Sequence, residues 1–232
     1  RAEDVPPSRL ARTRDVARAL SGRFPDAHTA VVVFKGAASV VVPMTEDPVA
    51  FELAMANLSG GLITTAGTDL RAGLEAALDA FPPGSPRHRI VVLFSDGESL
   101  QGSTDEVTER LRREEVPVLS VAVGTTGGAT IPAPSGGVRR DEEGEPVVVG
   151  VDEASLRRIA EISGGEFFRI IETGVTGAVA ERIEERIGRG TDVLFRRIDE
   201  SRSHLFVAAA LVLLAAVVVV QSVPWGRKRG VE

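Results

Sequence analysis

The sequence predicts an α/β domain, a doubly wound and mostly parallel sheet with helices on both faces, followed by one C-terminal transmembrane helix. Three continuous apolar runs, at residues 30–34, 90–94 and 118–123, are typical of parallel strands that are covered on both faces. Helical patterns separate these runs, and strands that alternate with helices indicate a doubly wound sheet. A longer uncharged apolar run at residues 205–220 indicates the membrane helix.

The first half of the domain is predicted to contain a helix, a strand hairpin and a second helix. Pro6 and Pro7 precede the first helical pattern. Residues 40–42 follow the strand at 30–34 after a turn at 35–36 that is too short for a crossover, so these strands form an antiparallel hairpin at one edge. The apolar residues at helical spacing are Leu10, Ala17, Leu20 and Phe24 in the first helix, and Leu70, Leu74, Ala77, Leu78 and Phe81 in the second.

The second half continues the alternation of helices and strands. Helical spacing recurs at residues 107–111 and 156–160. Residues 125–150 are rich in Gly and Pro and then acidic, which predicts an exposed excursion with a β-hairpin through Val138 and residues 147–149. Two glycines at 164–165 are predicted to end the preceding helix, before a last strand at 166–170 and a helix at 177–202 that leads to the membrane.

The C-terminal apolar segment has the length and the flanks of a membrane span. Extended to Trp225, it reaches about 31 Å as a helix, which matches a hydrocarbon core of about 30 Å. The basic residues at 227–229 place the C-terminus in the cytoplasm and the domain outside it, although Arg196, Arg197 and Arg202 flank the other end. We expect the membrane to be the inner membrane of a bacterium. We therefore expect a domain at 1–176, a helical connector at 177–203, a transmembrane helix at 204–225 and a basic cytoplasmic tail at 226–232.

Composition excludes several classes of protein. The formal net charge is -6, the wrong sign for a general nucleic-acid binder. The chain has no cysteine, which excludes disulfides and thiolate chemistry. It opens on Arg1 without a methionine or a signal peptide, so we expect it to be an N-terminally truncated fragment of a longer protein.

Two features fall where ligands gather in an open α/β sheet, beyond the carboxyl ends of the strands. Asp96 follows the strand at 90–94, and Gly97 lets the chain turn there. Thr68 lies where a helical pattern begins, and its hydroxyl can cap that helix or coordinate a hard cation. Taken singly, each feature has an ordinary structural explanation, because Asp-Gly is a common turn and Thr or Asp is a common N-cap.

The order and spacing of these features resemble the von Willebrand factor A (VWA) domain, and more narrowly its bacterial membrane-anchored aerotolerance (Bat-type) group. The resemblance covers essentially the whole chain, including the terminal membrane helix. The matching stretches are Gly67-Thr68-Asp69-Leu70, Leu93-Phe94-Ser95-Asp96-Gly97-Glu98, residues 2–10, Ser120-Val121-Ala122-Val123-Gly124-Thr125 and residues 156–165.

The resemblance implies a metal-ion-dependent adhesion site, abbreviated MIDAS. Thr68 and Asp96 map to two of its metal loops, with Gly67, Asp69, Ser95, Gly97 and Glu98 as supporting loop residues. The family's Asp-x-Ser-x-Ser motif has no counterpart here, so the site is incomplete in this chain and the central first strand is expected to be missing. Oxygen ligands alone suit Mg²⁺ or Mn²⁺.

In the family, a partner's carboxylate fills the open metal position, which is recognition rather than turnover. The resemblance suggests other VWA membrane proteins and a MoxR-type AAA ATPase as partners. One alternative is a metal-independent, membrane-tethered assembly protein. Another is a metal-dependent hydrolase that uses Asp96 with Glu98; a serine–histidine enzyme is disfavoured because His28 and His88 precede their strands, at the opposite end of the sheet.

Overall fold

The computed structural model describes residues 4–59, 67–83, 88–99, 102–130 and 148–191. Its centre is a parallel sheet of β3 (Val91–Ser95), β4 (Val118–Ala122) and β7 (Glu166–Arg169), in the order β3-β4-β7. All five residues of β4 are buried, as a strand covered on both faces requires. The prediction of parallel strands at two of the three apolar runs is therefore confirmed.

The remaining apolar run, at residues 30–34, forms the predicted hairpin. Strand β1 (Thr29–Phe34) pairs antiparallel with β2 (Ala38–Thr45), with Val31 opposite Val42. Among the described residues this hairpin is a separate two-stranded sheet and does not pair with β3. According to the family resemblance, one further strand would lie between the hairpin and β3, and the described residues do not test this expectation.

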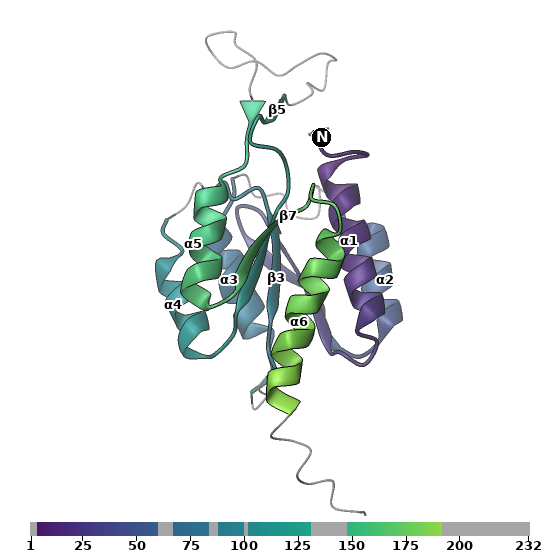
Figure 1. Ribbon diagram of the computed structural model, residues 1–232. Helices are drawn as coiled ribbons and strands as arrows, with labels where there is room; N and C mark the ends of the chain where they lie inside the picture. Colours follow the sequence, from purple (N-terminus) through teal and green to yellow (C-terminus); the bar gives the residue numbers. More distant parts are fainter. Residues whose placement is uncertain (1–3, 60–66, 84–87, 100–101, 131–147, 192–232) are drawn as a thin grey trace, which may run out of the picture. The chain divides into compact units, whose positions relative to one another are not determined.

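Helices cover both faces of the three-stranded sheet, as predicted (Figure 1). On one face, α1 (Arg9–Arg23) and α6 (Val175–Thr191) pack against Leu119 and Val121 of β4. On the other face, α3 (Leu70–Asp79), α4 (Asp105–Arg113) and α5 (Glu153–Ser163) pack around Val118 and Ala122. The two sets alternate along β4 because successive side chains of a strand point to opposite faces.

A third apolar cluster joins the hairpin to α2 (Pro48–Asn57). Phe51 and Met55 of this helix pack with Val31 and Val42. Asp47 caps the helix by accepting a hydrogen bond from the Val49 amide at 2.8 Å. The hairpin is thus held by α2 and by α3, which also contacts both of its strands.

The predicted glycine stop after α5 is confirmed. Gly164 has a φ of 76°, the left-handed conformation that ends many helices. A Cβ on Gly165 would collide with the carbonyl oxygen of Val118, so β7 can begin close against β4 only with glycine at this position. The α5–β7 connection therefore depends on two adjacent glycines for different reasons.

The remaining predicted elements are described in part. Strand β5 (Ala129–Thr130) pairs antiparallel with β6 (Val148–Val149), which fits the base of the predicted excursion, and Val138 lies outside the described residues. The compact unit extends through residue 190, and Val175, Val179 and Ala180 of α6 are buried in it. The predicted span at 204–225 and the basic tail also lie outside the described residues. In the described part of the chain, no helix is long and apolar enough to cross a membrane.

Candidate functional site

The loop after β3 holds Asp96 in a fixed position at the carboxyl edge of the sheet. The Ser95 hydroxyl accepts a hydrogen bond from the Gly97 amide at 3.0 Å. Gly97 has a φ of 81°, and a Cβ there would collide with the carbonyl oxygen of Asp152. The Asp152 amide in turn donates to the Asp96 carbonyl at 2.8 Å. Ser95 and Gly97 therefore hold the loop through these contacts and leave the Asp96 side chain at the edge.

The Asp96 carboxylate is incompletely compensated. Its side chain is 29% exposed, and its Oδ2 lies 3.5 Å from Nη1 of Arg9. The Glu98 amide donates to Oδ1 at 3.4 Å, near the limit of a hydrogen bond. Burial raises the pKa of Asp96, and the weak contacts with Glu98 and Arg9 lower it by less. The Asp96 carboxyl group therefore has remaining capacity to bind a cation or a hydrogen-bond donor.

Arg9 is held mainly by a second carboxylate, that of Asp4. Its Nε and Nη2 donate to Oδ1 and Oδ2 of Asp4 at 2.7 and 2.8 Å. The Thr125 amide and hydroxyl donate to Asp4 Oδ2 at 2.8 and 3.1 Å. These contacts, the Arg9 hydrogen bond first, lower the pKa of Asp4 to about 2. The Asp4 carboxylate thus accepts four hydrogen bonds, whereas the Asp96 carboxylate has only the two long contacts with Arg9 and Glu98.

Gly124 provides the space that the Arg9 guanidinium needs. Its φ is 139°, and a Cβ built on it would lie 2.8 Å from Arg9 Cζ and 2.7 Å from a methyl group of Val151. The arginine therefore crosses the end of β4 where the backbone carries no side chain. Asp4 and α1 are joined in this way to the loop after β4.

The loop that carries Thr68 is used for capping as well. Asp69, not Thr68, is the N-cap of α3, and it accepts a hydrogen bond from the Ala72 amide at 2.9 Å. The Asp69 amide donates to the carbonyl of Lys35 at 2.6 Å, which ties this loop to the hairpin. Thr68 is half-buried directly before the cap, after Gly67, whose φ is 94°.

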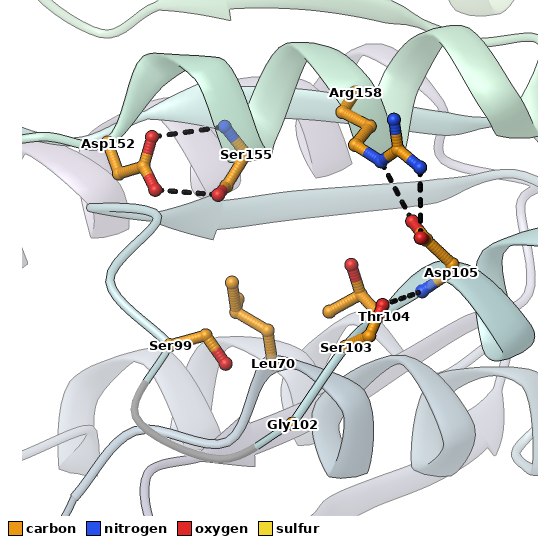
Figure 2. Close-up of a pocket in the computed structure, with 9 residues that line it drawn as sticks. All are labelled: Leu70, Ser99, Gly102, Ser103, Thr104, Asp105, Asp152, Ser155 and Arg158. Carbon is orange, nitrogen blue, oxygen red and sulfur yellow. Dashed lines mark hydrogen bonds and ion pairs between the residues drawn. The ribbon is translucent and has the colours of Figure 1, made fainter.

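A polar pocket of about 260 Å³ shows that the start of α3 lies beside the loop after Asp96, because Leu70 and Ser99 both line it (Figure 2). Its charged groups are already paired. Arg158 of α5 binds both carboxylate oxygens of Asp105 at 2.8 and 2.9 Å. Asp152 accepts from the amide and hydroxyl of Ser155 at 3.1 and 2.6 Å. The pocket is therefore bordered by the N-termini of α4 and α5, and it adjoins the candidate site.

The oxygen donors present fit a hard divalent cation as part of a coordination shell. Asp96 is a partly exposed carboxylate with unmet binding capacity, and Thr68 offers a hydroxyl from the neighbouring loop. Within the described ranges, no three acidic, histidine or cysteine side chains gather into a metal cluster. Thr68 and Asp96 therefore stay predicted ligands, and further ligands would have to complete the shell.

Comparison with known sequences identifies the family. Residues 1–98 match the family model of the von Willebrand factor type A domain. A UPF0353 protein from Nocardia farcinica is 32% identical over 94% of this chain, and the match covers 67% of that relative. The chain belongs to the von Willebrand factor type A family. A UPF0353 protein from Mycolicibacterium gilvum is 28% identical over 93% of the chain and 64% of its own length, so this VWA chain spans about two thirds of these relatives.

Two solved structures place this VWA domain in the Bat-type group. The conserved hypothetical protein BatB from Bacteroides thetaiotaomicron is 26% identical, with a TM-score of 0.76 over 81% of this chain and 92% of that one. An aerotolerance-related membrane protein from Bacteroides fragilis is 27% identical, with a TM-score of 0.73 over the same shares. The predicted resemblance, VWA and Bat-type, is confirmed.

The structure adds residues that sequence reasoning did not assign. Arg9, Asp4, Gly124 and Thr125 form the surroundings of Asp96, yet the sequence analysis noted them only as parts of two matching stretches. The order of those stretches was a usable signal, because one precedes the first helix and the other ends a strand at the carboxyl edge. Thr68 and Asp96 stay predicted ligands, and Glu98 contributes its amide, while its side chain is exposed.

Proposed function

We propose that this VWA domain is a membrane-anchored protein-interaction module that binds a partner protein at the carboxyl edge of its sheet through a divalent cation. The observation that carries the proposal is the incompletely compensated Asp96 carboxylate on a hydrogen-bonded loop at that edge. Thr68 and Asp96 would hold the cation in part, with Mg²⁺ or Mn²⁺ as the expected ions. The bound cation would supply an open coordination position for a carboxylate of the partner.

We propose binding rather than catalysis because the side chains of Asp96 and Glu98 do not act together at this edge. A phosphatase would need Asp96 and Glu98 to act together on an activated water. In the structure, however, Glu98 meets Asp96 through its backbone amide, and its side chain is exposed. The partners we propose, from the family resemblance, are other VWA membrane proteins and a MoxR-type AAA ATPase.

Membrane anchoring is supported by the predicted span at residues 204–225 and by one similar protein. The similar structure from Bacteroides fragilis is described as an aerotolerance-related membrane protein. A domain tethered close to a bilayer would meet other membrane-anchored partners at a raised effective concentration. Modest affinity at the Asp96 edge would then suffice for assembly.

The cation is tested by isothermal titration of Mg²⁺ and Mn²⁺ into the full chain and into an Asp96→Ala variant. Asp79→Asn, an exposed carboxylate variant at the end of α3, is the matched control. We expect saturable binding in the wild type and the control, and its loss in Asp96→Ala. Equal heats in all three proteins would contradict cation binding at Asp96.

The Arg9–Asp96 ion pair favours a second candidate function, a metal-independent assembly module. In that case Arg9 supplies the positive charge at the edge. Cross-linking of the protein in its own membranes, with and without EDTA, separates the two. Loss of cross-linked partner in EDTA supports the cation, and partner capture that EDTA leaves unchanged supports the metal-independent module.

A further inference from the structure

Arg9 lies between two carboxylates and is shared unequally between them. It makes two hydrogen bonds to Asp4, at 2.7 and 2.8 Å, and approaches Asp96 only to 3.5 Å. All three side chains are mostly buried, with 7, 13 and 29% exposure for Asp4, Arg9 and Asp96. In such surroundings a paired guanidinium and carboxylate interact strongly, so the choice of partner sets the charge at the edge.

We propose that Asp4 is a positioning residue that holds Arg9 away from Asp96 and so keeps the negative charge of Asp96 available to an incoming cation. This inference rests on the proposed function, because it concerns the same site. It assigns Asp4 and Arg9 opposite effects on cation binding. Asp4 favours binding by retaining the arginine, and Arg9 opposes it by competing for Asp96.

Asp4 has partners other than Arg9. The Thr125 amide and hydroxyl both bind Asp4 Oδ2, so the carboxylate is anchored to the loop after β4. Arg9 begins α1, whose N-cap Ser8 accepts a hydrogen bond from the Ala11 amide at 3.2 Å. Asp4 is thus held in part by the loop after β4, and Arg9 belongs to the first turn of α1, so a rotation of the Arg9 side chain would change the distance from its guanidinium to Asp96.

Removal of the charge of Asp4 would change that choice. An asparagine at this position keeps an oxygen for the Thr125 amide but loses the bidentate ion pair with Arg9. Asp96 would then be the nearer full negative charge, and a small rotation of the Arg9 side chain would shorten the 3.5 Å contact. A closer guanidinium occupies the oxygen that a cation needs.

The test uses the full chain with Mn²⁺ as the probe, titrated and followed by its electron paramagnetic resonance signal. The variants are Asp4→Asn, Arg9→Gln and the double variant. We expect Asp4→Asn to weaken Mn²⁺ binding on the order of tenfold, the size of one charge-assisted hydrogen bond gained by Asp96. We expect Arg9→Gln to strengthen it several-fold, and the double variant to behave like Arg9→Gln. Glu153→Gln, which disrupts the comparable Glu153–Arg169 pair, is the control and should leave binding unchanged.

The opposite effects of Asp4→Asn and Arg9→Gln on Mn²⁺ binding, and a double variant that behaves like Arg9→Gln, distinguish a positioning role of Asp4 from a structural one. If Asp4→Asn and Arg9→Gln both weaken binding, the network merely supports the fold and the proposal is overturned. No effect of Asp4→Asn in a protein that binds Mn²⁺ also overturns it.

A readout without metal separates this inference from the proposed function. The coupling between Arg9 and Asp96 is measured by a double-mutant cycle in denaturant, once in the wild type and once in the Asp4→Asn background. We expect the coupling, as a fold-change in the unfolding equilibrium, to increase in the Asp4→Asn background. If it increases while the wild type binds no Mn²⁺, the charge sharing holds and the proposed cation fails. An unchanged coupling overturns the inference.

Discussion

At the scale of single residues, Asp4 and Asp96 show how the surroundings shift the pKa of the same type of side chain in opposite directions. Asp4 receives four hydrogen bonds, and its pKa falls to about 2. Asp96 is desolvated with weak contacts, and burial raises its pKa. Ionised Asp4 stabilises the fold, whereas ionisation of Asp96 opposes folding and leaves a charge that a ligand can neutralise. The position of Asp96 was predictable from its strand and turn. The network was not, because Asp4 and Thr125 are 121 residues apart.

The lowered pKa of Asp4 predicts a specific loss of stability in acid. A carboxyl group whose folded pKa lies near 2, below its ordinary value of 3.8, stabilises the protein above that value and loses its contribution as the pH falls toward 2. Denaturant unfolding between about pH 5 and 2.5 should therefore be steeper in pH for the wild type than for Asp4→Asn. The difference should reach no more than about 2 kcal/mol. Parallel curves would contradict the assignment.

Gly124 is predicted to be a second glycine at the carboxyl edge, besides Gly97, that tolerates no side chain. Gly124→Ala introduces a Cβ 2.8 Å from Arg9 Cζ at a φ of 139°. Backbone strain and overpacking together should cost about 2–4 kcal/mol. Gly127→Ala is the control, because nothing lies within 4 Å of its Cβ position, and it should change the unfolding free energy by less than about 0.5 kcal/mol. Chemical denaturation of both variants measures this, and equal stability would refute the crowding.

At the scale of elements, the predictable parts were those that follow from local rules. The parallel strands followed from their continuous apolar runs, and the hairpin from a turn too short for a crossover. The cap of α3 shows the limit of such rules, since Thr68 and Asp69 are both common N-caps and the structure uses Asp69. The choice is set by a tertiary contact, the hydrogen bond from the Asp69 amide to Lys35, which no local pattern encodes.

The end of α5 is predicted to be fastened to β4 through one buried hydroxyl. Ser163 is 5% exposed, donates to the Ala160 carbonyl at 3.0 Å and accepts from the Val118 amide at 3.0 Å. Ser163→Ala deprives the first residue of β4 of this acceptor and should cost about 1–3 kcal/mol. Ser155→Ala, which removes a hydroxyl at the other end of the same helix, should cost less than about 1 kcal/mol. Denaturant titrations that rank the two variants in the opposite order would show that the hydroxyl of Ser163 is dispensable.

At the scale of the whole molecule, the sequence predicted the class of fold because alternating strands and helices admit few arrangements. It also predicted the carboxyl edge as the functional edge, where the structure places Asp96. What it could not predict is how charge is distributed there. That distribution depends on an arginine from α1 that meets residues from two other loops, and such meetings arise only once the sheet is assembled.

The orientation of the chain in the membrane is the last prediction, and the absence of cysteine from the sequence makes it clean to test. Gly177 is exposed and nothing lies within 4 Å of its Cβ position, so Gly177→Cys adds a thiol to α6 without disturbing its packing. Gly230→Cys adds one in the basic tail. The basic residues at 227–229 predict a cytoplasmic tail. A membrane-impermeant maleimide should therefore label Gly177→Cys in intact spheroplasts, and Gly230→Cys only after permeabilisation. The unmodified chain is the blank. The reverse pattern would place the domain in the cytoplasm, and labelling of both sites in intact spheroplasts would exclude a span between them.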